Sequence, residues 1–233
     1  MKLQRFFGKF DFRNKEVESS DYELINQIKN VFRYQRGAEV LLLDGLGKEA
    51  LGEIRKIDSD IVVFEIKKVT ENENITKNKV ALYCSILKKE NFELVTQKAT
   101  EIGVSEIYPL LSARTLKQNI KEDRMLKIIK EASEQSERGT IPVLHSPVEF
   151  RYAIKNTNKN DLNLFFDHSG QNISEIKNTE NKKINIFIGP EGGWEEYERE
   201  SAKENNFKIV SLGKLNLRGE TAAIVASYLA CGL

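Results

Sequence analysis

The feature that most restricts the fold of this chain is an alternation of strand-like and helix-like segments after residue 80. Short apolar segments are typical of buried strands, and apolar residues at three- and four-residue spacing are typical of helices. The expected strands are 80–87, 106–111, 141–144, 162–167, 184–189 and 208–212, and the expected helices are 91–103, 121–137, 194–205 and 220–230. Gly103 suits a helix C-cap. This order predicts a parallel α/β sheet with helices on both faces.

The first part of the chain predicts mostly β structure. The expected strands are 39–43, 50–57 and 61–69, with turns at Asp44-Gly45 and at 58–60. Asp21 is expected to cap a helix that runs to about Asn30. Short strands with tight turns and one helix suggest a small barrel. The polar segment 70–79 predicts a linker, and we expect a first domain over 1–72 and a second over 73–233.

Composition limits the classes of protein that the chain can belong to. It has 233 residues, 40% of them hydrophobic, and no run of the roughly 18 apolar residues that span a membrane. We identify no signal peptide and expect a cytoplasmic protein. Cys84 and Cys231 lie in apolar surroundings and are expected to be buried thiols. His145 and His168 have no clustered partners, so no metal site is expected.

The charge balance counts mildly against a nucleic-acid binder. The formal net charge is +1, whereas many nucleic-acid binders are strongly basic. Basic residues only slightly outnumber acidic ones between Ser112 and Arg138. On charge alone, a solvated helix face explains that segment better than a binding surface does.

A glycine-rich turn follows one of the expected strands. Residues 186–194 read I-F-I-G-P-E-G-G-W, so an apolar strand leads directly into a turn and then a helix. Ligands bind beyond the carboxyl ends of parallel strands, and glycines let them approach the backbone closely. The usual phosphate-loop patterns are absent. Glu191 would repel a phosphate, so a sulfonium-bearing or adenosine ligand suits the turn better. A tight connection without a ligand is the alternative.

A second glycine-containing loop follows the last expected strand. Residues 210–223 read V-S-L-G-K-L-N-L-R-G-E-T-A-A, and they place Arg218, Glu220 and Thr221 at the start of an apolar helix. Helix capping alone can explain Glu220 and Thr221. Two such loops after neighbouring strands favour a shared ligand site.

Three sequence blocks carry a resemblance to a known family. They are F-E-L-V-T-Q-K-A-T-E-I-G-V-S-E-I-Y-P-L-L over 92–111, A-S-E-Q-S-E-R with a following I-P within 128–142, and the pair I-G-P-E-G-G and L-x-L-R-G-E-T-A. On these blocks the chain resembles the RsmE family of the SPOUT superfamily, which methylates ring nitrogen 3 of a uridine in small-subunit ribosomal RNA. The segment V-F-R-Y-Q-R-G-A-E-V-L-L-L-D-G fits that family's PUA-like RNA-binding domain.

The resemblance implies a fold, a cofactor and a set of site residues. It implies a SPOUT-type sheet with a deep trefoil knot, a homodimer, and S-adenosylmethionine held by loops 164–167, 188–193 and 212–222. The implied cofactor-binding residues are Leu164, Phe166, Ile188, Gly189, Pro190, Glu191, Gly192, Gly193, Leu212, Gly213, Leu215, Leu217, Arg218, Glu220, Thr221 and Ala222. The candidate RNA-binding residues are Arg5, Arg33, Arg36, Arg114, Arg124, Gln135 and Arg138.

Arg218 is the catalytic candidate, because its guanidinium can steer the uracil or stabilise the charge that develops on it. For Glu191 and Glu220, a structural role in organising the loops is favoured over a catalytic role. The near-neutral net charge favours a shaped, assembled ribosomal subunit over naked RNA as substrate.

Two other functions remain open at the level of sequence. A SPOUT enzyme can methylate a ribose 2′-hydroxyl or another base nitrogen, and a ribosome assembly factor can bind RNA without catalysis. A methyl on uracil nitrogen 3 blocks base pairing and halts reverse transcription, which distinguishes it from a ribose methyl. The glycines Gly189, Gly192, Gly193 and Gly213 are all present, which favours the enzyme over the assembly factor.

Overall fold

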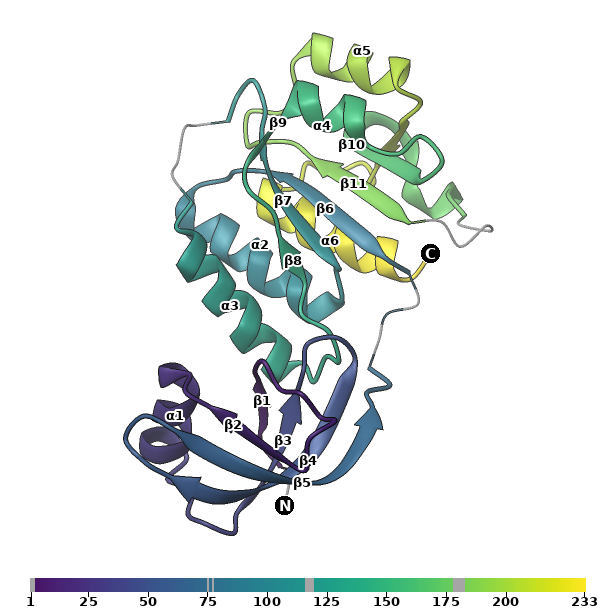
Figure 1. Cartoon of the computed structure of the whole chain (residues 1–233). Helices are drawn as coiled ribbons and strands as arrows, with labels where there is room; N and C mark the ends of the chain where they lie inside the picture. Colours follow the sequence, from purple (N-terminus) through teal and green to yellow (C-terminus); the bar gives the residue numbers. More distant parts are fainter. Residues whose placement is uncertain (1–2, 75, 77, 116–119, 178–182) are drawn as a thin grey trace. The chain divides into compact units, whose positions relative to one another are not determined.

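A computed structural model describes residues 3–74, 76, 78–115, 120–177 and 183–233 (Figure 1). The chain divides into two compact units, Met1–Ile75 with Ser133–Ile141, and Thr76–Ala132 with Pro142–Leu233. Ser133–Ile141 belongs to the first unit although Thr76–Ala132 of the second unit precedes it in the sequence. A division of the chain at a single residue cannot describe this arrangement. The division of the protein into domains 1–72 and 73–233 stays a prediction.

The first unit is a curled five-stranded sheet with one helical segment (Figure 1). The strands are β1 (Arg5–Phe7), β2 (Glu16–Ser19), β3 (Glu39–Leu43), β4 (Lys48–Ile57) and β5 (Val62–Glu71), in the order β1-β3-β4-β5-β2. β3 has the predicted bounds, and β4 and β5 lie within two residues of theirs. The short strands β1 and β2 were not predicted, because three or four residues do not show a period.

Asp21 caps the first helix as predicted. Its Oδ1 atom accepts hydrogen bonds from the backbone N–H groups of Glu23, at 2.9 Å, and Leu24, at 3.4 Å. The helix is α-helical over Tyr22–Asn26 (α1) and continues as a π-helical turn over Gln27–Val31. Leu24 and Ile28 on this segment are fully buried in the core of the unit.

The second unit contains the predicted parallel α/β sheet. Its strands are β6 (Val80–Ser85), β7 (Glu106–Leu111), β8 (Val143–Leu144), β9 (Val148–Glu149), β10 (Leu162–Asn172), β11 (Ile184–Ile188) and β12 (Lys208–Ser211). The order is β12-β10-β11-β6-β7-β8, with β9 also paired to β7, and all of these pairs are parallel. β7 has the predicted bounds.

Helices cover both faces of this sheet, as predicted (Figure 1). They are α2 (Lys89–Ile102), α3 (Glu122–Gln135), α4 (Phe150–Asn156), α5 (Glu196–Glu204) and α6 (Gly219–Cys231). α6 contacts α2, β6 and β11 on one face, whereas α4 contacts β7 and α5 contacts β12 on the other. Gly103 ends α2 in the left-handed conformation, with φ 116°. The short helix α4 and strand β9 were not predicted.

The cysteines and histidines differ in their surroundings. Cys84 is fully buried, and this burial raises the pKa of its thiol, whereas Cys231 is only half-buried, contrary to the prediction. His145 stacks on Tyr108 and lies 3.1 Å from a Glu106 oxygen. Among the described residues no helix has the length and apolar character needed to cross a membrane.

The deep trefoil knot stays a prediction.

The long strand β10 makes one very close backbone contact. Its pairing with β12 shifts register between Phe166 and Gln171, and Gly170 lies within this irregular stretch. A Cβ atom on Gly170 would overlap the backbone nitrogen of Val210 and the carbonyl group of Ile209. The absence of a side chain at residue 170 therefore allows β10 and β12 to lie this close together.

We predict that Gly170→Ala lowers the free energy of unfolding by about 1–3 kcal/mol, because two backbone segments must move apart. Urea denaturation followed by circular dichroism measures this change. Gly232→Ala is the matched control, since the nearest atoms to its new Cβ lie at 3.7 and 3.8 Å. Equal unfolding midpoints for the two variants would contradict the role given to Gly170.

Candidate functional site

The two glycine loops lie at one edge of the parallel sheet. Turn 189–193 follows β11 and loop 212–218 follows β12, and β10 pairs with both of these strands. A Cβ atom on Gly219, the first residue of α6, would lie 3.0 Å from Leu87 Cδ2 and 3.8 Å from the carbonyl oxygen of Gly189. The start of α6 therefore lies directly against the turn, and the two predicted loops converge.

The Trp194 side chain packs against turn 189–193. Its indole is buried, and a Cβ on Gly189 would lie 2.9 Å from indole Cε2. The indole Nε1–H donates a 2.9 Å hydrogen bond to the carbonyl oxygen of Phe166, the last residue of β10 before its register shift. The backbone N–H of Gly193 donates to the carbonyl oxygen of Pro190 at 2.9 Å. These contacts support the turn from the sheet and from within.

Two acidic residues connect the loops to the N-terminal end of α2. The Glu191 carboxylate accepts a 3.1 Å hydrogen bond from the backbone N–H of Lys88, the N-cap of α2. The Glu220 carboxylate accepts one from Asn91 Nδ2 at 3.3 Å. Both carboxylates thus hold loop geometry, which is the role that the sequence ranked first for them.

Loop 212–218 offers open space and unused donors. Gly213 has a φ of 117° and Gly193 a φ of 70°, and a Cβ on either residue would meet nothing within 4 Å. Within the described part of the chain, the backbone N–H groups from Gly213 to Leu217 have no hydrogen-bond acceptor. A ligand with several ring acceptors, such as an adenine, matches such a row of donors.

Arg218 is the N-cap residue of α6, and its carbonyl oxygen accepts the Ala222 N–H at 2.8 Å. Its side chain is exposed and has no ion pair with any described residue. A guanidinium at a helix start, beside a glycine loop, is available for a substrate that carries developing negative charge.

The other predicted cofactor residues divide by exposure. Leu164 is fully buried in β10, and Phe166 and Ile188 are also buried, so these three support the loops from the sheet. Leu215 is 79% exposed. Pro190 is buried, and Leu212, Leu217 and Ala222 are half-buried beside exposed Thr221.

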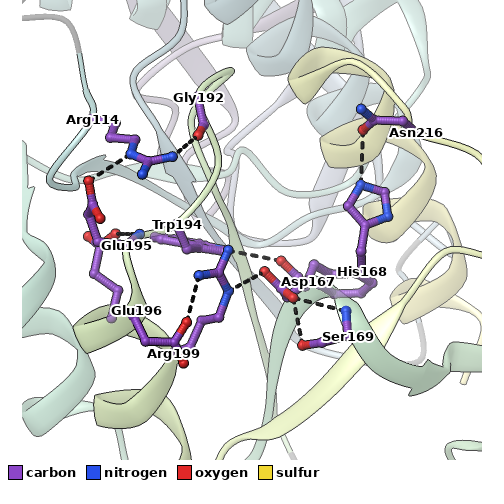
Figure 2. A network of polar contacts seen from close by, with 12 residues as sticks. Arg114, Asp167, His168, Ser169, Gly192, Trp194, Glu195, Glu196, Arg199 and Asn216 are labelled. Carbon is purple, nitrogen blue, oxygen red and sulfur yellow. Dashed lines mark hydrogen bonds and ion pairs between the residues drawn. The ribbon is translucent and has the colours of Figure 1, made fainter.

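A polar group in the irregular stretch of β10 was only partly predicted. The Asp167 carboxylate accepts hydrogen bonds from Ser169 N, Ser169 Oγ and Arg199 Nε at 2.9, 2.7 and 2.9 Å (Figure 2). His168 Nε2 lies 2.9 Å from Asn216 Oδ1, which connects β10 to loop 212–218. Burial opposes ionisation of Asp167, but these hydrogen bonds outweigh burial and lower its pKa.

The predicted RNA-binding residues of the first unit lie in different environments. Arg33, Arg36 and Gln135 are exposed. The Arg5 side chain is 16% exposed and forms a 3.2 Å ion pair with Glu137. Arg138 is 7% exposed, and its Nε donates to the carbonyl oxygen of Thr140 at 3.0 Å. Contacts within the unit thus occupy Arg5 and Arg138.

The two predicted RNA-binding residues of the second unit both have protein partners. Arg124 on α3 forms a 3.2 Å ion pair with Glu93 and stays half exposed. Arg114 donates hydrogen bonds to Glu195 Oε1 at 2.8 Å and to the carbonyl oxygen of Gly192 at 2.5 Å (Figure 2). Arg114 is therefore part of the support of turn 189–193. Long-range contacts of this kind have no signal in a single sequence.

Comparison with known families identifies the class of protein. Residues 74–230 match the model of an RNA methyltransferase domain, and residues 25–67 match the model of an RNA methyltransferase PUA domain. The chain is an RNA methyltransferase by this match, with a PUA domain in its first part. The expected fold class, a PUA-like domain followed by a methyltransferase sheet, is thereby confirmed.

Individual relatives identify the family more narrowly. Ribosomal RNA small subunit methyltransferase E of Rickettsia conorii is 30% identical over 91% of this chain and 88% of the relative. The protein of that name from Mesomycoplasma hyopneumoniae is 37% identical over 68% of this chain and 71% of the relative. The crystal structure of the Neisseria gonorrhoeae protein bound to S-adenosyl methionine superposes with a TM-score of 0.90, at 27% identity, over 97% of this chain and 95% of that one. The chain belongs to the ribosomal RNA small subunit methyltransferase E family.

We predict that the hydrogen bonds of Asp167 make stability depend on pH. Because the pKa of folded Asp167 lies below its ordinary value of 3.8, its contribution is fully present above that value. It is lost as the pH falls through the lower, folded pKa. Asp167→Asn should therefore lower the free energy of unfolding at pH 7, and the difference from the wild type should shrink below pH 3.8.

Urea denaturation at a series of pH values measures this difference. Glu200→Gln, an exposed change on the helix that carries Arg199, is the control and should cost less than about 0.5 kcal/mol at pH 7. A difference between wild type and Asp167→Asn that stays constant down to the acid limit of folding would contradict the assignment.

Proposed function

We propose that this chain transfers a methyl group from S-adenosylmethionine to ring nitrogen 3 of a uridine in small-subunit ribosomal RNA. The observation that carries the proposal is the convergence of turn 189–193 and loop 212–222, where Gly219 lies against Leu87 and the carbonyl oxygen of Gly189. Family membership and the S-adenosyl methionine bound to the Neisseria gonorrhoeae relative supply the identity of the donor.

The residues present fit such a donor. The open positions at Gly193 and Gly213 leave space beside the backbone on both loops, and the N–H groups from Gly213 to Leu217 match the acceptors of an adenine. Turn 189–193 and loop 212–222 would hold the donor between them, with Leu212, Leu217 and Ala222 as apolar contacts. Glu191 adds a negative charge to the turn, which suits a cationic sulfonium.

The chain contributes mainly alignment and electrostatics to this reaction. When bound, the donor supplies a methyl group that carries part of the positive charge of a sulfonium. Holding the acceptor nitrogen in line with that methyl supplies several kcal/mol through proximity alone. The N3–H bond of uracil must break, with its proton passing to solvent water, so negative charge develops on the ring as the N–C bond forms. The exposed guanidinium of Arg218 stabilises that charge.

The RNA surface and the assembly state follow from the same proposal. In the first unit, the exposed candidates for phosphate contacts are Arg33, Arg36 and Gln135. The first two lie in the predicted RNA-binding domain 1–72. In the second unit the candidate is Arg124. A net charge of +1 supports recognition of an assembled small subunit, and we also propose a cytoplasmic location. We also propose the homodimer and the trefoil knot typical of this family.

We predict that the purified chain forms 3-methyluridine in unmodified small ribosomal subunits supplied with S-adenosylmethionine. Nucleoside mass spectrometry identifies the product, and reverse transcription should stop at one position. Free ribosomal RNA is the comparison substrate, and we expect it to react more slowly. A product methylated on a ribose hydroxyl would contradict the assignment of nitrogen 3, and no methylated product at all would contradict catalysis.

We predict that Arg218→Ala lowers kcat about 10²–10³-fold, since it removes a positive group aimed at developing charge. Single-turnover methylation of small subunits at saturating donor measures this rate. Lys203→Ala, an exposed cation near the end of α5, is the matched control and should retain the wild-type rate. An unchanged rate in Arg218→Ala would remove Arg218 from the mechanism.

A further inference from the structure

We propose that turn 112–115 is a positioning element for the cofactor turn 189–193, and that Arg114 is the residue through which it acts. This inference rests on the proposed function. It replaces the RNA contact that the sequence suggests for Arg114. Every contact that carries it lies within the second unit.

Turn 112–115 is itself held rigidly. Ser112 N donates to Thr115 Oγ1 at 2.9 Å, and the hydroxyl groups of these two residues lie 2.7 Å apart. Ser112 Oγ also lies 3.0 Å from Oγ of Ser85, which is fully buried at the end of β6. The turn is thus connected to the buried sheet through a chain of three hydroxyl groups. Its sequence, S-A-R-T, gives no indication of this chain.

A buried carboxylate connects turn 112–115 to helix α5. Glu198 has no exposed surface, and its Oε1 accepts a 3.0 Å hydrogen bond from Ala113 N. Its Oε2 accepts a 2.9 Å bond from Glu195 N, which completes the capping box at the start of α5. The Glu198 side chain therefore binds the backbone next to Arg114, at Ala113, and the backbone of Glu195, which is a partner of Arg114. This limits the positions that the Arg114 guanidinium can take.

The Arg114 guanidinium uses this fixed base to hold the cofactor turn (Figure 2). Nη1 donates to the Gly192 carbonyl oxygen at 2.5 Å, and Nε donates to Glu195 Oε1 at 2.8 Å. The Arg114 hydrogen bond also lowers the pKa of Glu195, so Glu195 stays charged at neutral pH. A Cβ on Gly192 would lie 3.2 Å from Arg114 Cδ, so the two residues are in direct contact.

The ion pair between Arg114 and Glu195 is exposed, so we expect it to affect the geometry of turn 189–193 more than the stability of the fold. The side chains of Arg114 and Glu195 are 47% and 41% exposed, and exposed ion pairs contribute little to stability. The bond to the Gly192 carbonyl instead selects one geometry of a turn that three glycines make adaptable. Preorganisation of that kind improves ligand affinity without adding a contact to the ligand.

Calorimetry of the full-length chain with S-adenosylmethionine tests the proposal. Arg114→Ala should raise the Kd for the donor about tenfold or more, and Arg114→Lys should recover part of the loss, because a lysine can replace one of the two hydrogen bonds. Arg151→Ala is the matched control. Arg151 lies on α4, and its guanidinium packs over the ring of Tyr197 on α5, away from turn 189–193. Thermal unfolding midpoints should stay within a few degrees of the wild type.

Steady-state methylation of small subunits adds a second readout. Arg114→Ala should raise KM for the donor, leave kcat at saturating donor close to the wild-type value, and leave KM for the subunit unchanged. If the wild type binds the donor and Arg114→Ala binds it equally well, the positioning role is overturned while the proposed function stands. A raised KM for the subunit with unchanged donor affinity would also overturn it, in favour of an RNA contact. A wild-type chain that does not bind the donor would overturn both.

Discussion

The contact of Gly219 with Leu87 and the carbonyl oxygen of Gly189 is the interaction on which the site depends. It sets the first residue of α6 against turn 189–193, at the edge where β10, β11 and β12 all end. A side chain at residue 219 would press on the Leu87 side chain, its Cβ lying 3.0 Å from Leu87 Cδ2. Arg218, Glu220 and Thr221 then take their positions from the start of the helix, directly after the row of unused N–H donors from Gly213 to Leu217.

The acidic residues of the site serve its backbone more than its substrate. Glu191 accepts the Lys88 N–H, Glu220 accepts the Asn91 amide, and Glu198 accepts two backbone N–H groups while fully buried. Asp167 accepts one backbone N–H, from Ser169, and also holds the Arg199 side chain.

Local sequence signals predicted the elements well. The apolar strands β3 and β7, the cap at Asp21 and the left-handed C-cap at Gly103 each depend on a few consecutive residues, and the structure confirms them. Helix α4 is short and shows no clear period, so it was missed. The partners of Arg114, Arg5 and Arg138 depend on long-range packing. A list of cations in a sequence does not distinguish an arginine that holds a carbonyl oxygen from one that awaits a phosphate.

Amide hydrogen exchange with and without S-adenosylmethionine tests the central claim, that the two loops form one donor site, most directly. The account predicts slower exchange on donor addition in both stretches, 189–193 and 213–222, with little change in β3 to β5 of the first unit. The unused N–H groups from Gly213 to Leu217 should show the largest effect. Protection of one loop without the other, or of neither, would contradict the convergence of the loops on one ligand.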